Sequence, residues 1–261
     1  MKNMKTKPDY KNWTPPYMII LFSSLSVLSL AVVAGSMMYG MFVPSIISGI
    51  LGILSIAYDC MLIAWHRTFS WNGNRQMARQ IINGTASYVK IPDHGIGLDV
   101  GCGSGALTIA CAKKNPKSQM IGVDIRKGAW RNYSKKLCES NSVAEKVSNV
   151  AFETGNALKL PFEDETFDAV TSNFVYHNIH VQNRQDLLLE TLRVLKKGGT
   201  FTIHDIFSKM MYGDMDAFVR ELKEMGYQDV RLVSTTDGMF MTRKEARRLM
   251  MTGSALLIGR K

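Results

Sequence analysis

The chain has 261 residues and a formal net charge of +10, and 46% of its residues are hydrophobic. This length allows one large domain, or one domain with an appendage. The four cysteines show no paired metal-ligand spacing, so no metal site is predicted. The positive charge suits anionic lipid as readily as nucleic acid, but the sequence contains no nucleic-acid recognition module and no stretch of interleaved aromatic and basic residues. Nucleic acid is therefore not an expected partner.

Two long apolar segments follow a basic tail at residues 1–16. Met18–Met38 carries no charge, and Phe42–Trp65 carries only Asp59. Each segment can cross a hydrocarbon core of about 30 Å, so residues 17–66 are predicted to form a transmembrane helical hairpin. A cleaved signal peptide is the alternative for the first segment, but a second apolar segment directly behind it favours the hairpin.

Basic residues flank the hairpin, and its turn contains none. Those before it are Lys2, Lys5, Lys7 and Lys11, and His66 and Arg67 follow it. The positive-inside rule then predicts a cytoplasmic-membrane protein with both termini and the remaining chain in the cytoplasm. Because a charge inside the apolar segment is unfavourable, we expect Asp59 to face the other helix, to reach toward the headgroups or to be protonated.

Beyond about residue 69, helical and strand patterns alternate. Strands are predicted over residues 95–100, 118–124, 149–156, 167–174, 199–207, 230–235 and 254–261. Helices are predicted over residues 75–89, 106–114, 129–141, 186–199 and 215–227, and the basic run at 242–250 has the spacing of a solvated helix face. The sequence "KKGG" suggests that the fourth of these helices ends near Gly198. This alternation predicts an α/β fold with a doubly wound, Rossmann-like sheet and ligands at the carboxyl ends of its strands.

A glycine-rich turn, "LDVGCGSGA", joins the first predicted strand to a helix. Gly101, Gly103 and Gly105 let the backbone turn tightly and approach a ligand without a Cβ in the way. Cys102, which lies between Gly101 and Gly103, is interpreted as a small filling residue rather than as a redox site.

Two acidic residues beside this turn indicate what it binds. Asp124 ends the second predicted strand, where a carboxylate can accept two hydrogen bonds from a ribose diol. A nucleoside cofactor is therefore predicted. Asp99, two residues before the first glycine, would repel a pyrophosphate and so disfavours NAD.

Several motifs occur in one order: the glycine turn, "LPFEDETFDAV" at residues 160–170 and "LRVLKKGGTF" at residues 192–201. From about Gly97 to Lys261 the chain resembles the class I S-adenosylmethionine-dependent methyltransferases of the quinone-biosynthesis and small-molecule type. The resemblance implies a methyltransferase domain over residues 95–261, an antiparallel last strand and S-adenosylmethionine as cofactor.

The resemblance also implies roles for single residues. The family's cofactor loop, which holds the methionine part and the ribose, matches Asp99, Gly101, Cys102, Gly103 and Gly105. Asp124 matches the residue that binds the ribose hydroxyls, and Ile125 would lie beside the adenine. Asn156, followed by Ala157, stands where the family usually has an Asp for the adenine amine, so that contact would be uncharged.

Two further regions would border the methyl group. Asn173 and Phe174 match positions that line the methyl-transfer cleft in the family. Residues 67–94 match the segment that often folds over the cofactor as a lid, and Trp71 would cover the site there. Alternatively, Trp71 anchors the chain at the membrane interface, where tryptophan is favoured.

A base is needed only if the methyl acceptor must lose a proton, and it would lie near the carboxyl ends of the fourth and fifth strands. Tyr176, His177 and Asp205 are the candidate catalytic residues there. An ordinary hydrogen-bonded residue of the cleft stays open as an interpretation of His177, and it is preferred for His180 and His204.

These observations predict a membrane-anchored methyltransferase that acts on a small, apolar or lipid-like acceptor at the cytoplasmic surface. A NAD-dependent oxidoreductase and a non-catalytic cofactor-binding membrane protein are the alternatives. The sequence does not choose among carbon, oxygen, nitrogen and sulfur acceptors, since all of them occur on one fold.

Overall fold

The computed structural model describes residues 7–125 and 133–261, which fall into two compact units. One unit contains residues 80–261 with the described part of residues 1–10, and the other contains residues 11–79. The larger unit thus includes the segment from residue 80 and residues 7–10, and the predicted domain boundary at residue 95 stays a prediction. Lys2 and Lys5 of the basic tail lie outside the described residues.

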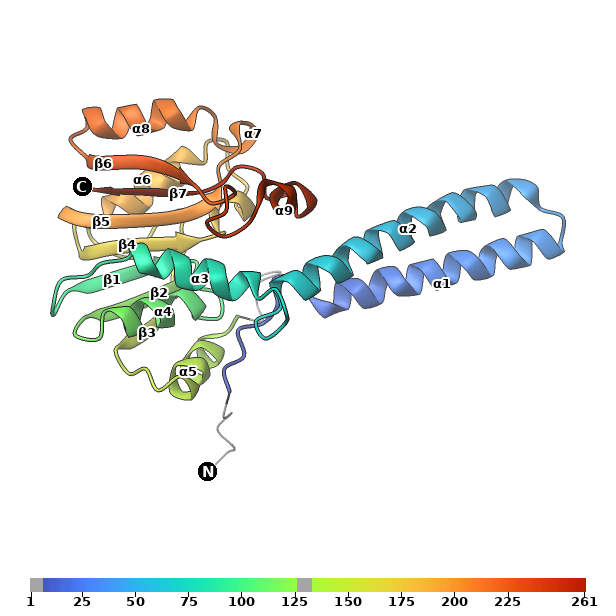
Figure 1. The fold of residues 1–261 in the computed structure, drawn as a ribbon, viewed down its shortest axis with the longest axis horizontal. Helices are drawn as coiled ribbons and strands as arrows, with labels where there is room; N and C mark the ends of the chain where they lie inside the picture. Colours follow the sequence, from blue (N-terminus) through green and yellow to red (C-terminus); the bar gives the residue numbers. More distant parts are fainter. Residues whose placement is uncertain (1–6, 126–132) are drawn as a thin grey trace. The chain divides into compact units, whose positions relative to one another are not determined.

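The smaller unit contains the two apolar helices α1 (Pro16–Met38) and α2 (Phe42–Phe69), drawn in blue in Figure 1. Both are long and apolar enough to cross a membrane. Only 6% and 11% of their most apolar windows are buried, whereas the core helix of a soluble protein is mostly buried. Since α2 continues to Phe69, His66 and Arg67 lie within the helix rather than just after it.

Small polar side chains join α1 to α2. Ser26 Oγ donates a hydrogen bond to Ser55 Oγ at 2.9 Å, and Ser55 Oγ donates to the carbonyl of Phe22 at 3.0 Å. Ser23 Oγ donates to Asp59 Oδ2 at 2.7 Å. The expectation that Asp59 faces the other helix is therefore confirmed.

The larger unit is built on a seven-stranded sheet with the order β3-β2-β1-β4-β5-β7-β6. Its strands are β1 (Ile96–Val100), β2 (Gln119–Asp124), β3 (Val150–Thr154), β4 (Phe167–Asn173), β5 (Leu195–Ile206), β6 (Gln228–Ser234) and β7 (Ser254–Arg260). The first five strands in that order pair in parallel, whereas β7 runs antiparallel to both β5 and β6. The α/β fold and its antiparallel last strand are thus confirmed.

Helices cover the sheet and its two edges (Figure 1). They are α3 (Met77–Tyr88), α4 (Ala106–Lys114), α5 (Lys135–Ala144), the 3-10 helix η2 (Tyr176–Asn178), α6 (Gln185–Arg193), α7 (Lys209–Tyr212), α8 (Met215–Glu224) and α9 (Arg243–Arg248). α5 packs beside β3 at one edge of the sheet and α8 beside β6 at the other, while α4 packs on β2.

Two predicted helix boundaries are wrong. α6 ends at Arg193, and residues 195–199 belong to β5, because Leu195 pairs with Phe167 of β4. The glycine expected to end the helix instead lies within that strand. The helix predicted over residues 129–141 begins only at Lys135, because Ser134 Oγ caps it by accepting from the N–H of Leu137. Residues 129–132 lie outside the described residues.

The connection between β6 and β7, residues 235–253, is fastened to the domain by buried apolar side chains that include Phe240. The Phe240 ring packs edge-on against His204 of β5, with the ring centroids 5.3 Å apart. A β-carbon placed on Gly84 of α3 would overlap the same ring. Glycine at position 84 therefore lets α3 and this connection approach each other closely.

Gly84→Ala tests that close approach. In an open helix this change stabilises by about 1 kcal/mol through helix propensity. Here we expect a loss of about 1–3 kcal/mol in the free energy of unfolding, because the added methyl overpacks against Phe240. Urea titration of the full chain in detergent measures the change. Adding Phe240→Leu should restore part of the loss, and a stabilised single variant would contradict the packing.

Candidate active site

The glycine turn between β1 and α4 is fastened to the end of β2. The N–H groups of Gly101 and Cys102 both donate to the carbonyl of Val123, at 2.8 and 2.9 Å. The N–H of Gly103 donates to Asp124 Oδ2 at 2.9 Å. The turn and the predicted ribose-binding carboxylate therefore form one hydrogen-bonded structure at the carboxyl edge of the sheet.

Two of the glycines are required by the backbone and by their neighbours. Gly101 has a φ of 73°, and a β-carbon on it would overlap the side chain of Val175. Gly105 has a φ of 80°, and a β-carbon on it would lie 2.9 Å from the Phe152 ring. Any larger residue would displace the turn from the strands on which it rests.

The interior side of the turn is filled by buried polar groups. Asp99 is only 1% exposed, its Oδ2 accepts a hydrogen bond of 2.6 Å from Thr108 Oγ1, and burial raises its pKa to about 7. This carboxylate supports α4 from inside the domain, and its contact with a ligand stays a prediction. A hydrogen bond with Cys138, together with burial, raises the pKa of the Cys102 thiol. A buried neutral thiol fits the interpretation of Cys102 as a small filling residue.

The predicted adenine side lies just beyond β2. Ile125 is an exposed apolar residue, with 40% of its surface accessible, directly after Asp124. Asn156 Oδ1 already accepts a hydrogen bond of 3.0 Å from the N–H of Leu158. The side chain of Asn156 is therefore hydrogen-bonded within its own turn. The neighbouring Ala157 is partly buried and packs against the core.

Tyr133 is a site residue that the sequence analysis missed. Its ring would lie 3.8 Å from a β-carbon on Gly103, and burial and the charge of Asp124 raise the pKa of its hydroxyl. Tyr133 falls within the helix predicted over residues 129–141 and carries no motif of its own, whereas the structure places it before α5. Trp71, the predicted lid residue, belongs to the smaller unit, and its role stays a prediction.

The N-terminal segment also contacts the glycine turn, which the prediction of a basic tail did not foresee. Ser104 Oγ donates to the carbonyl of Tyr10 at 2.9 Å. The buried Asn141 accepts from the N–H of Asp9 at 2.7 Å and donates to the carbonyls of Asp9 and Ser104, both at 3.0 Å. Asn141 thus ties α5, the turn and the start of the chain together.

His177 and Asp205, both predicted catalytic residues, form a hydrogen-bonded pair. His177 Nδ1 lies 2.5 Å from Asp205 Oδ1, and the side chain of His177 is 20% exposed whereas that of Asp205 is fully buried. Asp205 also accepts from the N–H groups of Tyr176 at 2.9 Å and Ile206 at 2.7 Å. Only His177 of the pair is accessible, and the contact predicted between Asp205 and the acceptor stays a prediction.

Tyr176 was also predicted to be catalytic, and that role stays a prediction. Its side chain is fully buried, its hydroxyl lies 2.6 Å from Thr191 Oγ1 of α6, and burial raises its pKa. Only its backbone N–H serves the site, through Asp205. His180 is exposed. Within the described residues, no three His, Cys, Asp or Glu side chains gather as a set of metal ligands.

His204 is a buried neutral histidine, as the preferred interpretation of it required. Its Nδ1 lies 2.7 Å from Asn173 Oδ1 and its Nε2 lies 3.0 Å from Ser254 Oγ, so both ring nitrogens are bonded within the core. Burial lowers its pKa from 6.5 to about 3. Phe174 stacks on the His204 ring and also contacts the His177 ring, with centroid distances of 4.4 and 5.9 Å. Asn173 and Phe174 thus connect the buried histidine to the accessible one.

Comparison with known proteins shows which family the region around the glycine turn and His177 resembles. Residues 98–203 match the sequence profile of the family described as "Methyltransferase domain". This region is a methyltransferase domain. The match begins at β1 and ends in β5, so it includes the glycine turn, Asp124 and His177.

Named relatives share part of the methyltransferase domain. The chain is 38% identical over 105 residues to a demethylmenaquinone methyltransferase of Symbiobacterium thermophilum, which is 40% of this chain and 39% of that protein. It is 31% identical over 145 residues to a demethylmenaquinone methyltransferase of a Geobacillus species, covering 54% of this chain and 55% of that one. The chain thus spans about half or less of the length of these curated relatives.

A solved structure shares the fold of the methyltransferase domain. The crystal structure of the [4+2]-cyclase SpnF superposes with a TM-score of 0.55 at 18% identity, covering 74% of this chain and 85% of that one. Because that protein is named for a cyclisation, the fold by itself does not decide the reaction.

The depressed pKa of His204 makes a prediction about stability. The folded chain keeps His204 neutral down to about pH 3, while the unfolded chain protonates it near 6.5, so its contribution to stability falls as the pH decreases through this window. Relative to His204→Gln, the wild type should lose about 2 kcal/mol more between pH 6.5 and about pH 5. Urea titrations in detergent at both pH values measure this. Parallel losses in the two proteins would refute the neutral buried state.

Proposed function

We propose that the chain is a membrane-anchored, S-adenosylmethionine-dependent methyltransferase that acts on a small, apolar or lipid-like acceptor at the cytoplasmic surface. The observation that carries the proposal is the accessible His177, hydrogen-bonded to the buried Asp205, beside the glycine turn. Val175, two residues before His177, is the side chain that a β-carbon on Gly101 would meet. The histidine pair and the turn therefore belong to one site.

The residues at this site fit the cofactor. The turn approaches the ligand position with glycine backbone, Asp124 can accept hydrogen bonds from the ribose hydroxyls, and the exposed Ile125 offers an apolar surface for the adenine. When bound, S-adenosylmethionine supplies a methyl group already activated by its sulfonium. Asn156 would meet the adenine amine without charge because its side chain is an amide, and its oxygen would be shared with the N–H of Leu158.

The pair of His177 and Asp205 is suited to remove a proton from the acceptor. Asp205 accepts the hydrogen bond from Nδ1–H, which leaves the lone pair of the neutral ring on Nε2. No partner of Nε2 is recorded in the described part of the chain. His177 would take the acceptor's proton at Nε2, and Asp205 would fix the ring and its tautomer. This chemistry favours an acceptor with an acidic proton, such as a phenol-like hydroxyl.

The relatives support a small acceptor. Two of them are named demethylmenaquinone methyltransferases, so we infer an acceptor of the menaquinone-precursor type. The match to a methyltransferase family argues against the NAD-dependent alternative. The non-catalytic alternative is the second candidate, because the fold alone does not decide whether a bound cofactor reacts.

Membrane anchoring is supported by the smaller unit. Its two helices expose most of their apolar side chains, which only an apolar surrounding would cover. The basic residues on both flanks of the hairpin favour a cytoplasmic location for the termini and the methyltransferase domain. An anchor of this kind would keep the site where apolar acceptors partition.

The function is tested with labelled methyl donor. Full-length protein in detergent should bind S-adenosylmethionine and transfer radiolabel to the lipid fraction of a cell-membrane extract. His177→Gln should lower the transfer rate by about 10²- to 10⁴-fold, because the base is lost, while the dissociation constant of S-adenosylmethionine stays unchanged. His180→Gln is the matched control and should keep full activity. Label found only in protein would contradict the proposed acceptor, and binding without transfer to any fraction would favour the non-catalytic candidate.

The anchor is tested by charge placement. Leu28 lies within α1 and is exposed, and Tyr39 lies in the turn between the helices and is also exposed. Leu28→Asp should reduce the carbonate-resistant membrane fraction, because an aspartate near the helix centre opposes insertion by about 2.5–3.5 kcal/mol. Tyr39→Asp should not reduce it. Release of the wild-type chain from membranes by alkaline carbonate would contradict anchoring.

A further inference from the structure

The connection between β6 and β7 lies at the carboxyl end of β5, the same end of the strands as the proposed active site. Ser254, the first residue of β7, pairs with Ile206 at the carboxyl end of β5, next to Asp205. The N–H of Thr235, just after β6, donates to the carbonyl of Ser254 at 3.0 Å. In Figure 1 this connection, with α9 in dark red, lies at the opposite end of the strands from the C-terminus.

The orientation of α9 is fixed by packing and capping. Ala246 and Leu249 are buried, with 2% and 6% of their surfaces exposed, and Met251 just beyond the helix is buried as well. A capping box joins Thr242 to Glu245 at the start of the helix. One side of α9 therefore always faces the core, and the other always faces outward.

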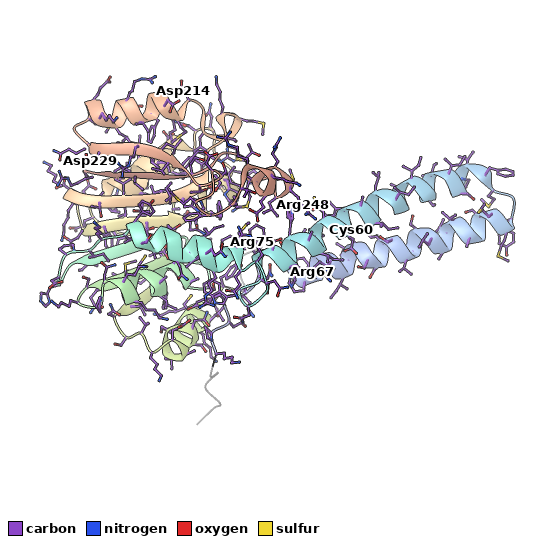
Figure 2. The ribbon with its side chains drawn as sticks, in the orientation of Figure 1. Cys60, Arg67, Arg75, Asp214, Asp229 and Arg248 are labelled. Carbon is purple, nitrogen blue, oxygen red and sulfur yellow. The ribbon has the colours of Figure 1, made fainter. Side chains whose placement is uncertain are left out.

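The outward side combines cations with apolar side chains. Lys244 and Arg247 lie three residues apart on α9 and are exposed, and so are Met250 just beyond the helix and Met239 before it, with 69% and 39% of their surfaces accessible. We call these four residues the α9 face. Arg243 forms an ion pair with Asp237, whereas Lys244 and Arg247 have no ion-pair partner among residues 7–125 and 133–261. Figure 2 labels Arg248 of the same helix at this end of the strands and Asp229 at the other end.

We propose that the α9 face docks on the surface of a bilayer that contains anionic phospholipid. Each basic side chain near such a surface is attracted to the anionic headgroups. Exposed methionines beside the cations can enter the boundary between headgroups and acyl chains. This inference rests on the membrane anchoring proposed above, since the hairpin belongs to the same chain and keeps the domain within reach of the bilayer.

Docking through the α9 face would turn the carboxyl edge of the sheet toward the lipid. His177 lies at that edge, so an acceptor dissolved in the membrane would reach it without crossing bulk water. A nucleic-acid partner fits the face less well, because its exposed apolar residues are methionines and no aromatic side chain is offered for stacking on bases.

The test places an environment-sensitive fluorophore on the α9 face of the full chain. In a Cys60→Ser background, Met250→Cys gives one exposed thiol, because Cys102, Cys111 and Cys138 are at most 7% exposed. Met225→Cys is the control. Met225 is also an exposed methionine, but it precedes β6 and so lies near the opposite end of the strands. Each protein is reconstituted into vesicles of phosphatidylcholine alone or of phosphatidylcholine with phosphatidylglycerol, with and without spin-labelled quencher lipid.

With phosphatidylglycerol at low salt, the probe at Met250→Cys should shift to the blue and be quenched by the spin-labelled lipid, and high salt should weaken both effects. The probe at Met225→Cys should do neither. The double variant Lys244→Glu and Arg247→Glu should lose the response. Arg220→Glu with Lys223→Glu, which makes the same charge change at the same spacing on exposed positions of α8, should keep it.

Three outcomes would overturn the inference. A probe at Met250→Cys that stays silent while the protein floats with the vesicles would overturn this inference alone. A chain that does not float with the vesicles would overturn the anchoring, and this inference with it. A response to RNA but not to anionic vesicles would assign the α9 face to nucleic acid.

Discussion

The buried carboxylate of Asp205 is the constraint on which the site depends. A carboxylate removed from water is unfavourable unless hydrogen-bond donors surround it. Here the donors are the ring of His177 and the backbone N–H groups of Tyr176 and Ile206. To supply these donors, the chain after β4 folds into η2. This turn fixes the orientation of the His177 ring. The same segment carries Val175 against the glycine turn, so one desolvated charge fixes the distance between the two halves of the site.

Most of the fold could be predicted from the sequence because local patterns and tertiary structure agree. The apolar run bounded by glycines became β1, the run at residues 118–124 became β2, and the glycine turn lies between β1 and α4 as its spacing indicates. The boundary between α6 and β5 was misjudged for a physical reason. "KKGG" has the chemistry of a helix end, but Leu195 gains a strand partner in Phe167, and tertiary pairing outweighs a local capping preference.

Candidate site residues could be named from the sequence where carboxylates and histidines lie near the ends of predicted strands, as Asp124, His177 and Asp205 do, and their roles stay predictions. The burial of Tyr176 could not be predicted, because sequence position does not reveal which way a side chain points in a single 3-10 turn. The contacts of Asp9 and Tyr10 with Asn141 and Ser104 were invisible, since hydrogen bonds between residues more than ninety positions apart leave no periodic signal.

The N-terminal contacts matter for any shortened form of the protein. Residues 7–10 belong to the same unit as residues 80–261, so the two apolar helices lie in the sequence between two parts of that unit. A shortened protein beginning after the helices would lose these contacts as well. Asn141 would lose the N–H and the carbonyl of Asp9, and Ser104 would lose the carbonyl of Tyr10. Buried polar groups beside the glycine turn would then be unsatisfied. Removing the helices by simple truncation would therefore damage the part whose activity is to be measured.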